Sequence, residues 1–350
     1  MDIVETLSIT IAPSGLPLAA FAHGTIAFTS KISGVPDLLL TLSTPGGKAA
    51  IERSLELPVF HPCVRLARWR ERPGELSFVP PDGKFVLAGY EVNLLPSSAD
   101  FDLRAPSNLH LPVSIEVARS LGSTGADFEA RLHLSNTYAH SSSTSSSGLG
   151  PRSSTPAFGS SGSSSAPLLA DVVVTIPIPT AVRNITDLRA SRGEAHFSPA
   201  ENVVEWRMPT KDAAAAGSAT LRCTVIGPLS DDDDDAATNG FRFDAASGEY
   251  DDNREEAYQS STSFADQTTK PAGARETHDQ RDQRRILLNA PLMPSSASVS
   301  FSVKGWLASG VRVEGLVVDT RKSRGLGEGV RPYKGVKYLT VSKRGLETRC

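Results

Sequence analysis

The chain has 350 residues and a formal net charge of −3, with 39% hydrophobic and 21% charged residues. This length allows two or three ordinary domains or one large all-β assembly, and it excludes a small disulfide-stapled scaffold. The slight net charge excludes wholesale nucleic-acid binding by counterion release, and no apolar run approaches the roughly 20 residues of a membrane-spanning helix.

The three cysteines, Cys63, Cys223 and Cys350, stand far apart. Their odd number and wide spacing do not suit a zinc site or a disulfide framework. The start of the chain, residues 1–5, is acidic and has none of the features of a signal peptide. We therefore expect a soluble intracellular protein with reduced thiols, no metal site and no cofactor.

The first hundred residues alternate β-rich runs with turns rich in Gly, Pro and Asp, and they show no sustained 3.6-residue periodicity. The runs predicted as strands are residues 3–11, 25–30, 38–42, 63–69, 75–79 and 84–95. Strands, and little helix, are expected in this block.

Two further blocks continue the same pattern. Their predicted strands lie within residues 111–135, 171–178, 195–197, 203–207, 219–226, 298–306, 311–318 and 333–340. Short strands at this spacing are typical of a β-sandwich. The sequence therefore predicts an all-β protein.

Two segments break the pattern. Residues 140–165 are almost entirely Ser, Thr, Gly and Pro, and residues 230–285 mix acidic and basic clusters with few large apolar residues. Neither can bury enough apolar surface to offset the entropy of ordering, so both are expected to be disordered inserts. The five aspartates at 231–235 suggest a calcium site, but no ligand-spaced Gly and Glu pattern follows them, so a solvated loop is favoured.

The usual local signatures of catalysis are missing: there is no Gly-x-Ser-x-Gly, no phosphate-binding loop and no His-Glu-x-x-His. His61 lies near Cys63, but a strand-entry turn is the favoured interpretation over a catalytic Cys/His pair. The glycines at 325, 327 and 329 lack the strand and helix that frame a nucleotide site. We therefore predict a binding protein with open sheet edges and not an enzyme.

Several distinctive strings occur together in one order. The most specific is Leu76-Ser77-Phe78-Val79-Pro80-Pro81-Asp82-Gly83-Lys84-Phe85, which lies between Phe60-His61-Pro62-Cys63-Val64-Arg65-Leu66 and Tyr90. Further matching strings lie at residues 174–179, 202–206, 309–313, 336–338 and 347–350. Together they resemble, over nearly the whole chain, the mu homology domain of clathrin-adaptor medium subunits. Trp69 and the string Tyr333-Lys334-Gly335-Val336-Lys337-Tyr338 look most like the medium subunit of adaptor protein complex 3.

The resemblance implies two immunoglobulin-like β-sandwich subdomains in an elongated arrangement, with subdomain B inserted into subdomain A. Subdomain A would comprise residues 1–106 and 307–350, and subdomain B residues 107–306 with the inserts at 140–165 and 230–285. The small longin-like N-terminal domain of medium subunits is expected to be absent.

The resemblance also implies a function. The chain would be a cargo-recognition subunit that binds Tyr-x-x-hydrophobic sorting signals in cytosolic tails of membrane proteins, beside an edge strand at residues 335–340. Its other implied partners are large and small adaptor subunits and, peripherally, Golgi or endosomal membranes, in transport to the lysosome or vacuole. The alternatives are an interaction scaffold that has lost signal binding, and another adaptor or coatomer-type medium subunit.

The implied pocket for the signal tyrosine has four positions of interest. Asp2 aligns with the acidic pocket residue of the family, and Lys337 falls where other medium subunits place an arginine. Gly335 and Thr29 stand where the endocytic relative has a tryptophan and a lysine. A buried tyrosine hydroxyl needs an acceptor such as Asp2, and a nearby cation offsets the cost of desolvating that carboxylate.

The implied pocket for the hydrophobic signal residue consists of Val313, Leu316 and Val336, with Tyr338 on the same segment. Extended spacing would send the tyrosine and the residue three positions later into separate pockets. The alternative for the three aliphatic residues is ordinary sandwich core.

Overall fold

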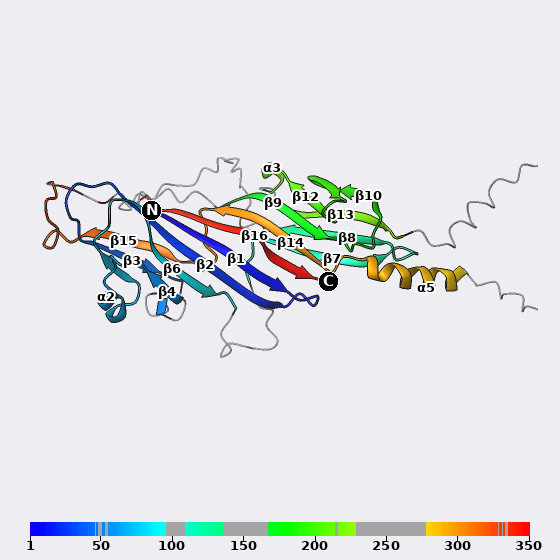
Figure 1. The fold of residues 1–350 in the computed structure, drawn as a ribbon, viewed down its shortest axis with the longest axis horizontal. Coiled ribbons are helices and arrows are strands. Elements are labelled where there is room, and N and C mark those ends of the chain that lie inside the picture. The colour runs from blue at the N-terminus through cyan, green and yellow to red at the C-terminus, as the bar shows by residue number, and fades with distance from the viewer. Residues whose placement is uncertain are drawn as a thin grey trace, which may run out of the picture.

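The computed structural model describes residues 1–45, 47, 51–52, 55–95, 109–135, 167–213, 216–228, 278–327, 329–330, 332 and 335–350. These residues form mainly β-strands, and the molecule is elongated (Figure 1). The predicted all-β fold class is therefore confirmed.

The main sheet of the described chain runs through most of the length of the molecule (Figure 1). Its strands are β1 (Asp2–Ile11), β2 (Pro17–Ser30), β4 (Glu56–Phe60), β6 (Gly83–Asn93), β9 (Leu168–Pro177), β11 (Glu194–Ser198), β12 (Val203–Met208), β14 (Ser296–Lys304) and β16 (Lys337–Arg349). They follow the order β11–β12–β9–β14–β16–β1–β2–β6–β4. Only β1 and β16 are parallel neighbours in this sheet.

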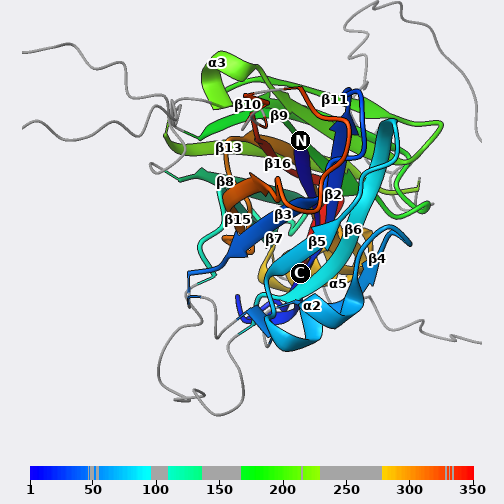
Figure 2. The same cartoon turned by 90° about the vertical axis from the view of Figure 1, so that its left-hand side faces the viewer.

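Two smaller sheets accompany the main sheet. One contains β15 (Arg312–Val318), β3 (Leu38–Ser43) and β5 (Glu75–Phe78) in that order. The other contains β10 (Asn184–Ala190), β13 (Gly217–Ile226), β8 (Asp127–Leu134) and β7 (Val113–Leu121) in that order. Figure 1 shows them toward opposite ends of the molecule, and Figure 2 views the molecule from the end that carries β3 and β15. The proposed boundaries of subdomains A and B, and their immunoglobulin-like character, stay predictions.

The buried face of the main sheet follows from alternation along its strands. In β1, Ile3, Leu7 and Ile9 are at most 1% exposed, whereas Thr6 and Ser8 between them are exposed. Each fully buried aliphatic side chain of this kind contributes about 1.5–3 kcal/mol. A register slip of one residue would expose all three together, so the hydrophobic pattern fixes which face of β1 looks inward.

The prediction of a strand at residues 63–69 is wrong, because a short helix, α2 (Leu66–Glu71), stands there. Its sequence consists mostly of good helix formers. Its Trp69 ring packs 5.0 Å from the ring of Phe60, so α2 covers the end of β4. Only Val64 of the predicted strand keeps a β-bridge, to Phe78 of β5.

The other helices are α3 (Thr210–Ala213), α5 (His278–Asn289) and the 3-10 turn η4 (Ala290–Leu292). Helix α5 occupies residues 278–285, the last part of the segment predicted as disordered, so that boundary is corrected. Its hydrophobic anchor is Ile286, which lies against Gly125. The insert at 140–165, and residues 230–277 of the second insert, lie outside the described residues. Strands β4 and β10 were not predicted from the sequence.

Candidate functional site

Strand β16 was predicted as an edge over residues 335–340, and the structure places most of it inside the sheet. Lys304 of β14 pairs with Leu339, and the backbone N–H of Gly305 donates to the carbonyl oxygen of Tyr338 at 2.9 Å. The open edge is therefore shorter than predicted and precedes Tyr338. The reason is that β14 continues to Lys304 before the chain turns away at Gly305.

On its other side, the start of β16 is held by β1. The backbone N–H of Lys337 donates to the carbonyl oxygen of Met1 at 3.0 Å, and the amino group of Met1 donates to the carbonyl oxygen of Gly335 at 3.1 Å. Successive backbone groups of a strand point to opposite sides. The N–H and C=O of Val336 therefore point away from β1, to a side where no described strand pairs with them.

The polar residues predicted for the tyrosine pocket lie together on the outer face of the sheet. Asp2 and Lys337 are register partners on parallel strands, so their side chains lie side by side. The next residue of β1, Ile3, is fully buried, which directs Asp2 outward. Thr29 shares this face of β2, two residues beyond Ala27, the partner of Asp2.

The aliphatic residues predicted for the second pocket lie on the inner side. Leu316 is 5% exposed and belongs to the hydrophobic core, whereas Val313 and Val336 are partly buried and pack against that core. The hydroxyl of Tyr338 accepts a hydrogen bond from the backbone N–H of Val313 at 3.1 Å, which ties β16 to β15. Core packing alone accounts for Leu316, while Val313 and Val336 keep accessible surface.

The two groups of residues thus flank the open edge from opposite faces. Lys337 faces outward with Asp2, and Val336 and Tyr338 face the core side, as do the buried Thr340 and Ser342 farther along β16. In an extended peptide, residues an odd number of positions apart point to opposite faces. A strand added at this edge would therefore direct residue i toward Asp2 and residue i+3 toward Val313.

A buried polar network, not predicted from the sequence, braces β1 against the loop between β14 and β15. The carboxylate of Glu5 is fully buried and accepts the hydroxyl of Tyr90 at 2.8 Å and the backbone N–H of Ser309 at 3.1 Å. The hydroxyl of Ser309 also donates to it. Burial, and then the adjacent Glu5, raise the pKa of Tyr90 well above its usual range. The sequence did contain one signal of this network: Glu5 stands between Ile3 and Leu7 in the alternation that faces the core.

Gly24 makes this network possible. Glu5, Gly24 and Tyr90 are register neighbours on β1, β2 and β6, and the ring of Tyr90 crosses Gly24 to reach Glu5. A Cβ atom on Gly24 would lie 2.0 Å from Cζ of that ring. Only a residue without a side chain fits at this position.

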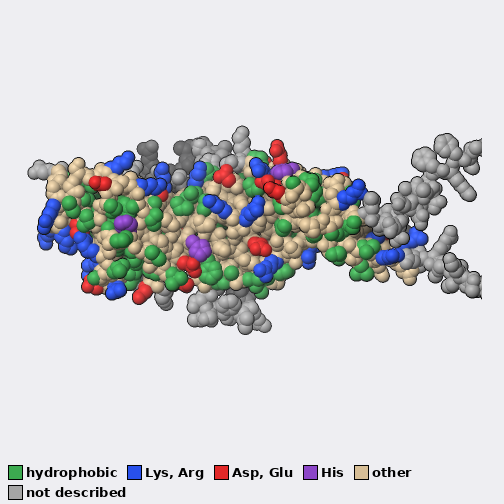
Figure 3. Space-filling view, viewed as in Figure 1, with side chains coloured by type: hydrophobic (Ala, Val, Ile, Leu, Met, Phe, Trp, Pro, Cys, Tyr) green, Lys and Arg blue, Asp and Glu red, His purple; other side chains and the backbone are tan. Residues whose placement is uncertain are grey.

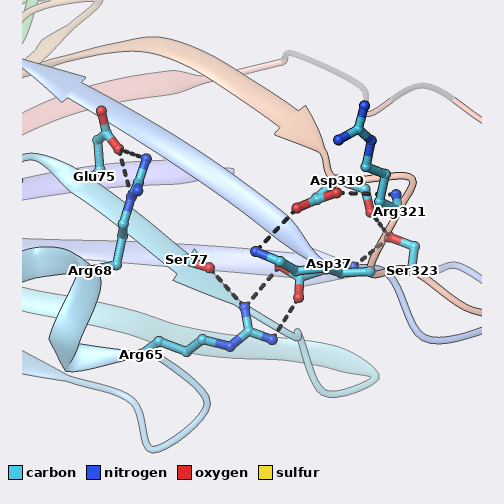
Figure 4. Close-up of polar contacts among 9 residues, drawn as sticks. Asp37, Arg65, Arg68, Glu75, Ser77, Asp319, Arg321 and Ser323 are labelled. Carbon is cyan, nitrogen blue, oxygen red and sulfur yellow. Dashed lines mark hydrogen bonds and ion pairs between the residues drawn. The ribbon is translucent and has the colours of Figure 1, made fainter.

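A second polar cluster holds the loop that follows β15 (Figure 4). Asp37 is 4% exposed and accepts both terminal nitrogens of Arg65, at 2.9 and 2.6 Å. The hydrogen bond to Asp37 raises the pKa of Arg65. The backbone N–H of Asp37 donates to the hydroxyl of Ser323 at 2.9 Å, and the N–H of Asp319 donates to the carbonyl of Asp37 at 2.8 Å. One aspartate thus joins the segments that lead into α2 and β3 to the loop after β15.

Replacing Asp37 by alanine is expected to lower the free energy of unfolding by about 2 kcal/mol. Breaking a fully buried ion pair costs more, but 45% of the Arg65 side chain is exposed and can be hydrated again. The measurement is urea denaturation followed by tryptophan fluorescence. The control is Asp82→Ala, because it removes the carboxylate of an exposed aspartate by the same substitution. Equal effects of the two substitutions would contradict the anchoring role of Asp37.

Another feature is an open pocket of about 420 Å³ on the four-stranded sheet. Its buried Glu129 is hydrogen-bonded by Arg131 and Arg222, which hold the pKa of Glu129 below its usual value. The charged groups around Glu129 are thus paired with one another.

The described residues include no cluster of three or more His, Cys, Asp or Glu side chains that could hold a metal ion. Nor does any described helix combine the length and apolarity required to cross a membrane.

The sequence is similar to medium subunits of adaptor complexes. The sequence matches the family described as "Adaptor complexes medium subunit family" over residues 1–350. It is 28% identical to the human AP-3 complex subunit mu-2 over 231 residues, which cover 65% of this chain and 44% of that protein. It is 40% identical to the AP-3 complex subunit mu of Dictyostelium discoideum over 91 residues, which cover 26% of this chain and 20% of that protein. The chain spans less than half the length of these relatives.

Similar folds occur among known structures. A chain in a homology model of the full-length AP-3 complex in an intermediate open conformation has a TM-score of 0.52 at 18% identity, covering 98% of this chain and 66% of that one. The yeast delta-COP-I mu-homology domain complexed with a Dsl1 WxWxV peptide has a TM-score of 0.50 at 13% identity, covering 99% and 96%. At these identities the likeness shows the fold alone.

Proposed function

Because this chain belongs to the adaptor complexes medium subunit family, we propose that it recognises cargo in a vesicle coat of the adaptor protein complex 3 type. It would bind Tyr-x-x-hydrophobic signals in cytosolic tails of membrane proteins by β-strand addition. The observation that carries the proposal is the short open edge at residues 335–337, with Asp2 and Lys337 on one face and Val313 and Val336 on the other. This is a binding role with no catalytic step.

The outer face suits an unmodified tyrosine. The carboxylate of Asp2 would accept the phenol hydroxyl, and Lys337 beside it would offset the negative charge. A lysine is a point charge without the bidentate geometry of arginine, so this pocket would hold the hydroxyl less rigidly than an arginine would. A phosphotyrosine, with a charge of about −2, would be repelled by Asp2.

The inner face suits an aliphatic side chain. Val313 and Val336 keep accessible apolar surface, and Leu316 would form the floor beneath them. Tyr338 would fix the spacing between β16 and β15 through its hydrogen bond to Val313. Because a free cytosolic tail must be ordered on binding, the affinity should be roughly micromolar, with avidity on a membrane that presents several signals.

The cellular setting is part of the proposal. Large and small adaptor subunits would be the partners within the coat, and the chain would associate peripherally with Golgi or endosomal membranes. The route would lead to the lysosome or vacuole. The similarity to AP-3 medium subunits supports this assignment.

The test is a titration of the purified chain with a fluorescent Tyr-x-x-Leu peptide, followed by anisotropy. We expect saturable binding that weakens at least tenfold when the peptide tyrosine becomes Ala, Phe or phosphotyrosine, since each change removes or repels the hydroxyl contact with Asp2. Asp2→Ala should have the same effect, with circular dichroism unchanged. Glu116→Ala, at an exposed carboxylate on β7, is the matched control and should bind normally.

Two outcomes would contradict the proposal. Absence of binding in a folded chain would favour the scaffold alternative, to which the core position of Leu316 already lends support. Binding of a Trp-x-Trp-x-Val peptide in place of the tyrosine peptide would favour a coatomer-type medium subunit.

A further inference from the structure

Positive charge gathers at the end of the molecule beyond the open edge. Figure 3 shows Lys and Arg side chains clustered at the left-hand end of the face it draws. In the described segments 31–37, 80–84 (the turn before β6 and the start of β6) and 319–327, Asp37 is paired with Arg65 and Asp319 with Lys322. The remaining charged residues are the exposed Lys31, Lys84, Arg321, Arg324 and Asp82. The described residues of this surface therefore carry an excess of three positive charges.

The loop that presents the two arginines is held in place. Arg324 exchanges two backbone hydrogen bonds with Val35, at 2.8 and 3.0 Å. A Cβ atom on Gly34 would lie 2.5 Å from the carbonyl oxygen of Gly325, so the two loops are in close contact there. In Figure 4 the guanidinium of Arg321 points away from the Asp37 cluster. Because the backbone is already positioned, little ordering would be needed for these cations to meet an anionic partner.

This surface, which we name the basic tip (Lys31, Lys84, Arg321 and Arg324), lies in line with the open edge. Asp2 pairs with Ala27 on β2, and Lys31 follows four residues later, about 13 Å along the strand direction. On the facing sheet, Val313 pairs with Leu42 and Val318 with Leu38, again about 13 Å. A peptide seated at the edge would reach the basic tip with about four to six further residues.

We propose that the basic tip binds acidic residues that flank the sorting signal in a cargo tail. This inference rests on the proposed function and narrows its substrate class to signals with a carboxylate cluster about four to six residues away, on one side only. The contacts would be exposed charge pairs, which act on association and selectivity more than on total affinity. They would also be screened by salt, because the Debye length is about 10 Å at 0.1 M ionic strength.

The test compares three fluorescent peptides that share one Tyr-x-x-Leu signal. One has neutral flanks, and the other two carry three glutamates four to six residues before or after the signal. We expect one of the two acidic peptides to bind about three- to tenfold more tightly than the neutral peptide at 50 mM salt, as two or three exposed charge pairs would give. The gain should disappear at 1 M salt.

Matched variants locate the effect. Arg321→Gln combined with Arg324→Gln should abolish the gain and leave binding of the neutral peptide unchanged. Arg281→Gln combined with Arg285→Gln makes the same charge change on exposed residues of α5, at the other end of the molecule, and should leave the gain intact.

The outcomes separate the two proposals. If the neutral peptide does not bind, the proposed function fails. If it binds and neither acidic peptide binds more tightly, or if the gain survives Arg321→Gln with Arg324→Gln, the inference about the basic tip is overturned. It is also overturned if that double variant leaves peptide selectivity intact and only reduces sedimentation with phosphatidylserine vesicles, because the tip would then face a membrane.

Discussion

Gly24→Ala is expected to lower the free energy of unfolding by about 3–5 kcal/mol, a large part of the 5–15 kcal/mol that stabilises a typical domain. The added methyl would lie 2.0 Å from the ring of Tyr90, which is buried and hydrogen-bonded to Glu5. The ring can move away only by giving up that bond and its packing, so overpacking and an unpaired buried group add together. Thermal and urea denaturation followed by circular dichroism would measure the loss.

Gly89→Ala is the matched control, because it makes the same chemical change one residue before Tyr90 on β6. The nearest atom to its Cβ would be the carbonyl oxygen of Gly24 at 3.8 Å, an ordinary contact. Its effect should stay within about 1 kcal/mol. A Gly24→Ala chain as stable as Gly89→Ala would refute the ring-over-glycine account, and Tyr90→Ala should make Gly24→Ala far less costly in the double variant.

Glu5→Ala should cost about 3 kcal/mol or more, since it leaves the hydroxyls of Tyr90 and Ser309 and the N–H of Ser309 without their acceptor in a buried site. Tyr90→Phe removes a single donor and should cost less, about 1–2 kcal/mol. Both would be measured by urea denaturation. Because Ser309 precedes β15, Glu5→Ala should also speed hydrogen exchange at the amides of β15, close to the proposed signal site.

Glu56→Ala removes a carboxylate of similar size from an exposed position on β4 and serves as the control, with an expected change within about 0.5 kcal/mol. If Glu5→Ala is no more destabilising than Glu56→Ala, the buried network does not brace β1. If stability falls while exchange in β15 is unchanged, the network supports the fold without supporting the site.

The local pattern predicted the elements whose buried face is regular. Alternation in residues 3–11 and 38–42 corresponds to β1 and β3, and the turns after Pro80 and Pro36 lie at strand ends. The secondary-structure predictions were wrong where the local residue preferences differ from what tertiary packing requires. Val64 and Trp69 are residue types common in strands, yet residues 66–71 form α2, where Trp69 packs on Phe60. Helix α5 was missed because its charged sequence has few large apolar residues.

For the candidate site, the resemblance identified Asp2, Lys337, Val313, Leu316, Val336, Gly335 and Tyr338, and their role stays a proposal. The resemblance did not predict toward which face of the sheet each of these side chains points, or how much of the predicted edge of β16 is open. The parallel register of β1 on β16 sets Asp2 beside Lys337, and the length of β14 sets where the edge opens. The first depends on pairing between residues more than 300 positions apart, and the second on the pairing of Lys304 with Leu339.

The sequence alone determined the fold class, because strand alternation and turn chemistry are local properties that each segment carries by itself. Packing of the sheets, by contrast, sets the buried Glu5 network, the fit of Tyr90 over Gly24 and the shape of the basic tip. Each of these joins residues distant in the chain, such as Glu5 with Ser309 and Val35 with Arg324. Contacts of this kind form only when the sheets pack, so no single segment of the sequence encodes them.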